Sequence, residues 1–318
     1  GQRTGRNKPG QPEKGGAAMN RLITFLILLS LAAAGCASVS AGAPPVPVFD
    51  TGADPDSWAA IPAGAFLQGP HNHEAEIAHD YEMMVTAVTN AQFAAYLNEA
   101  LAGGMLTMGD AGVMGYYPGD EFHGYEHEQE IPAGDWLHFP LNEPDSRLTF
   151  DGQTFSVIPG YEDHPATMVT WFGAKGYCAW VDGRLPAELE WEKAARGTDG
   201  RPYPWGGDIE PANANFYKSG DPFEGSPNEV GNTTPVGFYN GQAYDGFQTL
   251  DSPSSYGLYD MAGNVWQWTG DVYPDTHLRT LRGGGKMDYG YDLRVWEFNS
   301  AGPDFYSPSF GFRCARDS

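Results

Sequence analysis

The chain has 318 residues, of which 41% are hydrophobic and 14% aromatic, so it can bury a large core and is not an intrinsically disordered protein. Its formal net charge is −23, and residues 37–318 alone hold 13 basic and 40 acidic side chains, a net charge near −27. This acidic excess argues against nucleic acids and anionic membranes as partners and suits the binding of cations.

The N-terminal segment has the pattern of an export signal. Residues 1–18 are polar, basic and glycine-rich, and we interpret them as lying outside the mature fold. Met19 follows, and Arg21 then precedes an apolar run over residues 22–34. Such a run is too short to cross a bilayer comfortably, which takes about 20 residues, so we expect residues 19–35 to be a cleaved lipoprotein signal peptide.

Cys36 follows small residues at the end of this pattern and is the expected lipidation site. The chain is then exported and anchored to the cell envelope by lipid, and Ala37 favours the outer membrane of a two-membrane cell. An ordinary cleaved signal with an incidental cysteine is the alternative. Residues 36–56 are rich in Ala, Ser, Gly and Pro and are expected to form a flexible tether, so the domain begins near Ser57.

The first half of the domain shows strand and helix patterns. Residues 58–69 alternate apolar residues with turn formers, which predicts a pair of short strands. Thr89 and Gln92 have the spacing of a capping box, and apolar residues follow at helical spacing until Gly103, which predicts a helix. Residues 103–163 are glycine-rich, acidic and aromatic, and are interpreted as a long irregular insertion with one hairpin at Arg147–Val157.

Two more helices are predicted in the second half. One runs from about Phe172 to Val181, and the other from Pro186 to Arg196, where proline in the first turn and Gly197 mark the limits. Beyond Gly197 the sequence predicts many short strands and ordered loops.

Three cysteines are present, Cys36, Cys178 and Cys314. If Cys36 carries lipid, the other two are expected to pair in an oxidising compartment, although two separate buried thiols are possible. A bridge closing a loop of this length would stabilise the fold by about 4–5 kcal/mol in the chain-entropy model.

Several blocks of the sequence stand in a fixed order: IPAGAFLQG at 61–69, VTNAQFAAYL at 88–97, HPATMVTWFGAKGYCAW at 164–180, GRLPAELEWEKAARG at 183–197, YPWG at 203–206, YGLYDMAGNVWQWTGDVY at 256–273, LRGGG at 281–285 and GFRCAR at 311–316. Together they resemble the formylglycine-generating enzyme family, also called the sulfatase-modifying factor family. The resemblance implies a single compact α+β domain over residues 57–318, related to the C-type lectin fold and poor in regular secondary structure. It also implies a disulfide between Cys178 and Cys314.

The family carries structural calcium, so the resemblance implies one or two calcium sites here. The first set would be Asn215, the carbonyl of Phe216, Asn228 and the carbonyl of Val230. The second would be Asp260, the carbonyls of Gly263 and Val265, and Gln267, where Gln stands in place of the usual Glu. Oxygen ligands from side chains and backbone are those that Ca²⁺ prefers. In the alternative, this stretch is a tight turn whose Trp266 and Trp268 fill the core.

The aerobic enzymes of this family bind copper through two cysteines that follow the RGGS-like block, because paired thiolates select Cu(I). The matching segment here, Gly283–Asn299, has no cysteine, and Leu293 and Phe298 fall near the expected positions. We therefore expect no copper and no formylglycine-generating activity. Iron-dependent sulfoxide synthases carry a related domain, but His123 and His127 are better explained as part of a solvated acidic loop.

The favoured hypothesis is a non-catalytic ligand-binding module at the cell surface. Aromatic residues mixed with Gly, Asp and Ser in segment 286–310 resemble a paratope composition, and variable ligand-binding proteins use this fold. The candidates are Tyr289, Tyr291, Trp296, Phe298, Phe305 and Tyr306. The partner would be an extracellular protein, peptide or glycan. The alternatives are a metal-dependent oxidoreductase acting on a secreted peptide or small molecule, and a structural envelope or filament protein.

Overall fold

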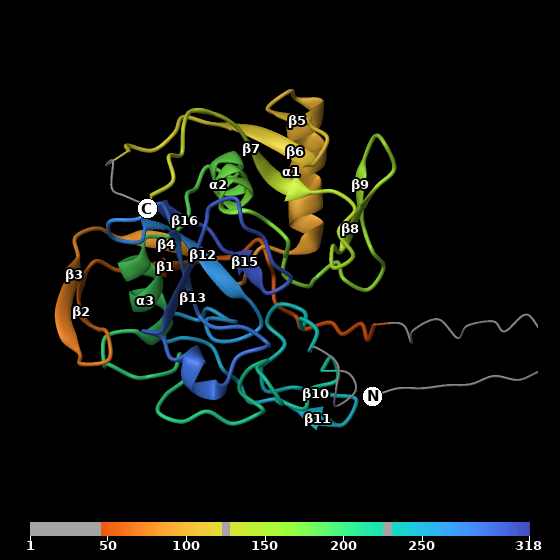
Figure 1. The fold of residues 1–318 in the computed structure, drawn as a ribbon. Helices are drawn as coiled ribbons and strands as arrows, with labels where there is room; N and C mark the ends of the chain where they lie inside the picture. The colour runs from red at the N-terminus through yellow and green to blue at the C-terminus, as the bar shows by residue number, and fades with distance from the viewer. Residues whose placement is uncertain (1–45, 123–127, 225–230) are drawn as a thin grey trace, which may run out of the picture. The chain divides into compact units, whose positions relative to one another are not determined.

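The computed structural model describes residues 46–122, 128–224 and 231–318 (Figure 1). Its helices are α1 (Asn90–Ala102), α2 (Trp171–Trp180) and α3 (Glu188–Arg196), with a 3-10 turn η1 (Gly290–Leu293). The strands before α2 are β1 (Trp58–Ile61), β2 (Gly64–Gln68), β3 (His73–Ile77), β4 (Tyr81–Met84), β5 (Leu106–Met108), β6 (Gly112–Tyr117), β7 (Gly134–Pro140), β8 (Leu148–Phe150) and β9 (Phe155–Val157). Those after α3 are β10 (Ala243–Tyr244), β11 (Phe247–Gln248), β12 (Trp266–Val272), β13 (Arg279–Arg282), β14 (Phe298–Ala301), β15 (Phe310–Phe312) and β16 (Ala315–Asp317).

The central sheet has the strand order β14-β13-β12-β15, and β12 pairs in parallel with β15 and antiparallel with β13. The tryptophans of β12 point into the core on this sheet. Trp268 is fully buried, donates its indole N–H to the carbonyl of Val169 and meets Phe310 edge to face at 5.3 Å. A second sheet has the strand order β1-β4-β16, so the last strand, β16, pairs with β4 from the first part of the domain. Short, mostly antiparallel strands with three separate helices in one unit confirm the predicted α+β domain.

Helices α1 and α2 begin within one residue of where the sequence predicts. Thr89 and Gln92 form both hydrogen bonds of the capping box on α1, and the hydroxyl of Thr170 accepts from the N–H of Gly173 at the start of α2. The start of α3 is two residues later than predicted, because Pro186 precedes the N-cap residue Ala187 instead of lying in the first turn. The hairpin over Arg147–Val157 is confirmed as β8 and β9.

The disulfide between Cys178 and Cys314 is confirmed, and both cysteines are fully buried. It joins α2 to the chain between β15 and β16. Around it, aromatic rings of α1, α2 and β15 pack together, with Phe93, Tyr177 and Phe312 in mutual contact. The bridge therefore lies inside the main hydrophobic core.

The two short strands predicted within residues 58–69 are confirmed as β1 and β2, although each pairs with another strand, β1 with β4 and β2 with β3. One prediction about strands needs correction. The insertion over 103–163 is not irregular throughout, because β5, β6 and β7 form an antiparallel sheet that packs on α2 and lies beside it in Figure 1. The glycines of β6 hide its strand pattern in the sequence. Glycine is needed at position 115, because a side chain there would meet the buried His138 ring at 2.4 Å.

Residues 46–56 contact the domain, although the sequence assigns them to a tether. The ring of Phe49 packs against Phe223, Phe238 and Tyr244, with centroids 5.1–6.0 Å apart. The hydroxyl of Thr51 donates to the carbonyl of Val236 at 2.9 Å. The ordered part of the chain therefore begins before Ser57. Residues 1–35 and Cys36 lie outside the described residues.

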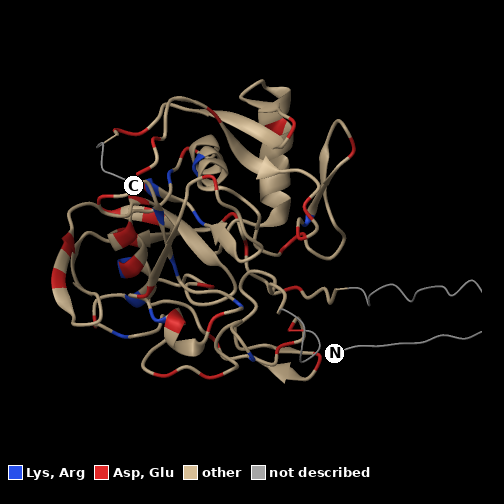
Figure 2. Cartoon of the chain, in the orientation of Figure 1, with Lys and Arg blue, Asp and Glu red and all other residues tan. Residues whose placement is uncertain are grey.

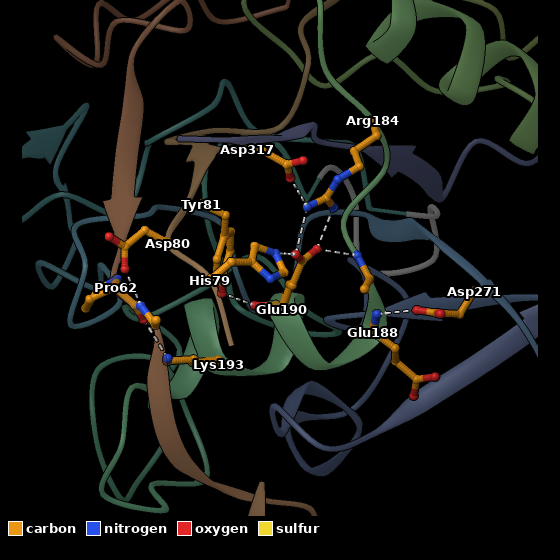
Figure 3. Close-up of polar contacts among 12 residues, drawn as sticks. Pro62, His79, Asp80, Tyr81, Arg184, Glu188, Glu190, Lys193, Asp271 and Asp317 are labelled. Carbon is orange, nitrogen blue, oxygen red and sulfur yellow. Dashed lines mark hydrogen bonds and ion pairs between the residues drawn. The ribbon is translucent and has the colours of Figure 1, made fainter. Parts of the chain in front are cut away.

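A polar network holds the start of α3, as Figure 3 shows. The buried carboxylate of Glu190 accepts two hydrogen bonds from Arg184, at 2.6 and 2.8 Å, and one from the backbone N–H of Ala187 at 2.8 Å. His79 lies 3.1 Å from the same carboxylate, and Arg184 also reaches Asp317 at 2.7 Å. This network ties α3 to β16 at the end of the chain.

Many basic residues are buried, which leaves the surface more acidic than composition suggests. The fully or nearly fully buried ones are Lys193, Arg196, Arg279, Arg282, Lys286 and Arg313. Figure 2 shows acidic residues on β3 and on many loops, and residues of both signs on α3. Within the described ranges no helix has the length and apolar character needed to cross a membrane.

Candidate functional site

Segment 283–299, where the resemblance leads us to look for copper ligands, begins with a tight glycine loop. Gly283 and Gly284 have φ of +97° and +71°, a conformation that favours glycine. A side chain on Gly284 would meet Leu293 at 2.8 Å and the carbonyl of Asp292 at 3.1 Å. The glycines therefore let the chain fold back closely on η1.

Asp288 organises the loop that follows. Its carboxylate accepts hydrogen bonds from the indole N–H of Trp266 at 2.7 Å and from the N–H of Gly285 at 2.8 Å. Its carbonyl accepts from the N–H of Tyr217 at 2.9 Å. Burial acts to raise the pKa of Asp288, and these hydrogen bonds act against that rise. The loop is thus joined to β12 on one side and to residue 217 on the other.

Lys286 fixes the loop from a third side. The ammonium group donates to the carbonyl of Pro308 at 2.5 Å and to the hydroxyl of Ser309 at 3.3 Å. Burial lowers the pKa of Lys286 to about 8. Neither Lys286 nor Asp288 is a candidate from the sequence, because only their burial in the folded loop distinguishes them from surface residues.

Two of the six aromatic candidates join a third ring at the surface. Tyr289 and Tyr291, at the start of η1, are 55% and 56% exposed, and their rings lie parallel with centroids 6.0 Å apart. Tyr217, 40% exposed, meets Tyr289 edge to face at 5.1 Å. We call these three residues the tyrosine cluster. Sequence patterns do not identify Tyr217, which comes from a distant part of the chain.

The other four candidates contact different neighbours. Trp296 lines a groove with Arg294, described below. Phe298 on β14 is exposed and stacks on Tyr273 at 5.7 Å. Phe305 packs on the buried Phe310 at 5.7 Å, and Tyr306 donates its hydroxyl to Glu143 at 2.9 Å. The six candidates therefore do not form one continuous contact set.

The positions near the expected copper ligands are apolar. Leu293 is fully buried with Tyr203, Ala214 and Ala262, while Phe298 is an exposed strand residue. Two of the three cysteines are bonded to each other. His123 and His127, the near match to an iron site, lie outside the described residues. Within the described ranges no three His, Cys, Asp or Glu side chains are grouped to hold a metal.

The second predicted calcium set is already engaged in hydrogen bonds. The amide oxygen of Gln267 accepts from Trp191 at 3.0 Å and from the buried Arg313 at 2.7 Å, and its amide nitrogen donates to the carbonyl of Asp260. The carboxylate of Asp260 accepts from the N–H of Gly237 at 2.7 Å. A guanidinium thus occupies the oxygen that calcium would need, so Gln267 does not fit as a calcium ligand in this arrangement.

The first predicted calcium set is only partly described. Asn215 is buried and donates its amide to the carbonyl of Asn232 at 2.8 Å, and the carbonyl of Phe216 accepts from Ser219. Asn228 and Val230 lie outside the described residues. Calcium at either set stays a prediction, and elemental analysis of the purified chain would count the ions.

A cavity of about 210 Å³ lies between the insertion over residues 103–163 and the connection from β12 to β13. Asp120 at its wall forms an ion pair with the buried Arg279, whose guanidinium lies 4.3 Å above the ring of Trp171. The carboxylate of Glu128 lies 2.8 Å from Nδ1 of His277 and accepts from the backbone N–H of His277 at 2.7 Å. These contacts fasten the insertion to β13, which gives the charges here a structural role.

Comparison with known proteins bears on the whole domain. The family described as sulfatase-modifying factor enzyme 1-like domain matches residues 48–318. Mouse formylglycine-generating enzyme is 30% identical over 295 residues, covering 81% of this chain and 74% of that protein. Serine/threonine-protein kinase Pkn1 of Chlamydia trachomatis serovar L2 is 37% identical over 193 residues, covering 54% of this chain. The chain spans only 27% of the kinase's length, so nothing of kinase activity follows.

Among solved structures, PvdO from Pseudomonas aeruginosa superposes with a TM-score of 0.55 at 22% identity, covering 86% of this chain and 99% of that one. At that identity the similarity shows a shared fold and carries no conclusion about activity.

Proposed function

This chain belongs to the sulfatase-modifying factor enzyme 1-like family, and we propose that within it the protein is a non-catalytic ligand-binding module of the cell envelope. The observation that carries the proposal is that segment 283–299 has exposed tyrosines and no cysteine. Where the family's copper enzymes have paired cysteines, this chain has a rigid loop that presents the tyrosine cluster to solvent.

The tyrosine cluster has the physical properties of a contact surface. Tyrosine offers a large amphipathic area with few rotatable bonds, so little conformational entropy is lost when it binds. The loop below it is fixed by Lys286, Asp288 and Trp266, which favours a preorganised surface. The ligand would be an extracellular protein, peptide or glycan.

A binding panel tests this proposal. The chain from residue 37 is applied to peptide and glycan arrays, beside the double variant Tyr289→Ser/Tyr291→Ser. We expect the wild type to bind a subset of the array and the double variant to bind at least tenfold more weakly. Tyr116→Ser is the matched control, because Tyr116 is 69% exposed on β6 and belongs to another surface. Equal loss in the control, or no loss in the double variant, counts against the cluster.

Elemental analysis separates this proposal from the oxidoreductase alternative. The chain is purified without chelators and its metals are measured by mass spectrometry. Near-stoichiometric iron or copper, together with turnover of a peptide substrate, contradicts a non-catalytic role. Calcium alone, with no transition metal, agrees with it.

We also propose that the module is held on the membrane by lipid at Cys36, after cleavage of residues 19–35. The lipobox-like sequence supports this step. A Cys36→Ser variant expressed in a bacterial host should move from the membrane fraction to the soluble fraction, and mass spectrometry of the wild-type N-terminus should find a diacylglyceryl group. An unmodified Cys36 on a cleaved, soluble chain would instead indicate an ordinary secretion signal.

A further inference from the structure

A groove of about 460 Å³ lies between two segments far apart in the chain. One wall comes from Pro202, Tyr203 and residues 207–209, and the other from Arg294 and Trp296. Pockets of this size hold small ligands or a few residues of a peptide. The groove therefore has room for the end of a peptide chain.

The walls of the groove are fixed to each other. The N–H of Val295 donates to the carbonyl of Pro202 at 2.9 Å, and the hydroxyl of Tyr203 donates to the carbonyl of Gly290 at 2.9 Å. Trp205 stacks on Tyr203 with centroids 5.6 Å apart and ring planes within 6°. Because these bonds exist before any ligand arrives, binding would order little of the protein.

Arg294 is the unusual charge in this groove. Most described arginines form ion pairs with carboxylates, namely Arg184, Arg196, Arg201, Arg279, Arg282 and Arg316. Arg294 is half-buried and has no carboxylate partner among the described residues, although the chain is strongly acidic. Its guanidinium carbon lies 5.9 Å from the ring centre of Trp296. Burial raises the pKa of the Tyr203 hydroxyl, and the charge of Arg294 and a hydrogen bond from it act against that rise. A cation that contacts a neutral hydroxyl and no carboxylate at the wall of a groove is suited to receive an anionic ligand.

We propose that this groove binds the free carboxyl terminus of a peptide, with the carboxylate on Arg294 and the last side chain against Trp296 and Ile209. The guanidinium fork matches the two oxygens of a carboxylate. This inference rests on the proposed function, since it names a ligand for a groove next to the tyrosine cluster in the chain. Tyr291 of that cluster lies three residues before Arg294, and the N–H of Arg294 points to the carbonyl of Tyr291 at 3.4 Å.

The chemistry of the walls favours a peptide over a sugar or a polyanion. Arg294 and Asp208 are the charged side chains that line the groove, and the hydroxyl of Tyr203 is already donated to Gly290. Few groups are left to recognise the many hydroxyls of a sugar. A net charge near −27 repels polyanions, so a single carboxylate next to apolar groups fits better.

The test uses the full chain with two mixtures of random octapeptides, one with free and one with amidated carboxyl termini. Peptides retained on the protein are quantified by mass spectrometry. We expect at least tenfold more retention of the free acids, about 1.4 kcal/mol. Arg294→Gln should abolish this preference, and Arg294→Lys should restore only part of it, because an ammonium lacks the planar fork. Arg316→Gln is the charge-matched control, since Arg316 pairs with Glu82 on β4.

Each outcome has a defined meaning. Equal retention of both mixtures, no retention of either, or a preference that survives in Arg294→Gln overturns the inference. If retention is equal but still depends on Tyr289 and Tyr291, the module binds ligands and only the role of Arg294 is lost. Oligogalacturonate that binds through Arg294 while the peptides do not would overturn the inference and assign the groove to an acidic glycan.

Discussion

Arginines beside α3 and beside η1 lie in contrasting surroundings. Arg196 and Arg282 are buried, and both reach the carboxylate of Glu192, at 2.8 and 3.3 Å. Arg294 lies at the wall of an open groove and has no carboxylate partner among the described residues. Burying a charge without a partner is costly, so a buried guanidinium must be matched inside the fold. A guanidinium left half-exposed can keep part of its hydrogen-bonding capacity for a ligand.

The difference teaches that charge count alone does not locate function in this chain. The region around α3 holds more ionic contacts than the groove, and its buried arginines are paired with carboxylates inside the fold, although the Nε atoms of Arg196 and Arg282 have no hydrogen-bond partner. The region around η1 has fewer charges, but its aromatic rings are exposed and its arginine is unmatched. Substitutions should therefore reduce stability in the first region and ligand binding in the second.

The largest expected effect is that of Glu192→Gln. The change leaves Arg196 and Arg282 buried without their shared carboxylate, which should cost about 3–5 kcal/mol of unfolding free energy. Urea denaturation followed by tryptophan fluorescence measures it. Asp199→Asn is the control, since Asp199 pairs with Arg201 near the surface and should cost less than about 1 kcal/mol. If Glu192→Gln lowered the free energy of unfolding no more than Asp199→Asn does, the buried ion pairs beside α3 would not be distinguished from surface pairs.

The pH dependence of stability at Glu190 gives a second test of the ion pairs around α3. Burial acts to raise the pKa of Glu190, but hydrogen bonds from Arg184 and Ala187 outweigh burial, and the net effect lowers it below the ordinary 4.5. A carboxyl group with a lowered pKa contributes stability above its unfolded pKa and loses it as pH falls through the folded value. Glu190→Gln should therefore be less stable than wild type by about 2 kcal/mol at pH 7.

The gap in unfolding free energy between wild type and Glu190→Gln should narrow as pH falls below 4.5, the ordinary pKa of the group, and through its lowered folded value. Thermal unfolding at several pH values measures both curves. A gap that stays constant across this range would mean that Glu190 acts by shape and not by charge.

Gly284→Ala tests whether the loop below the tyrosine cluster is as rigid as its contacts indicate. At φ of +71° with Leu293 only 2.8 Å from the new carbon, the substitution should cost about 1–3 kcal/mol. It should also weaken array binding, because the loop must shift to accept the methyl group. Gly246→Ala is the control, since Gly246 also has positive φ but has no atom within 4 Å of an added carbon. Unchanged binding in a destabilised Gly284→Ala variant would separate loop geometry from recognition.

The sequence allowed prediction of much of the fold but little of this contrast. Capping at Thr89, the pairing of Cys178 with Cys314 and the family blocks depend on local patterns or on resemblance, and all are confirmed. Strand β6 does not follow from the sequence, because Gly115 serves close packing on His138 and Gly112 close packing on β7, and neither marks a turn. Partners distant in the chain, such as Tyr217 with Tyr289, follow from tertiary packing, which no local pattern encodes.

Arg294→Gln should have the smallest effect on the free energy of unfolding. A small loss is the strongest test of the contrast between the paired arginines beside α3 and Arg294. Arg294→Gln removes no ion pair within the described residues; it changes only a partly exposed contact with the Tyr203 hydroxyl and a weak cation–π contact with Trp296 of about 0.5 kcal/mol. Chemical denaturation should therefore place the variant within about 0.5 kcal/mol of wild type. A loss as large as that of Glu192→Gln would show that Arg294 is part of the structural network after all. A stable variant that has lost its preference for free carboxyl termini would show the opposite, that this arginine is kept unpaired for binding.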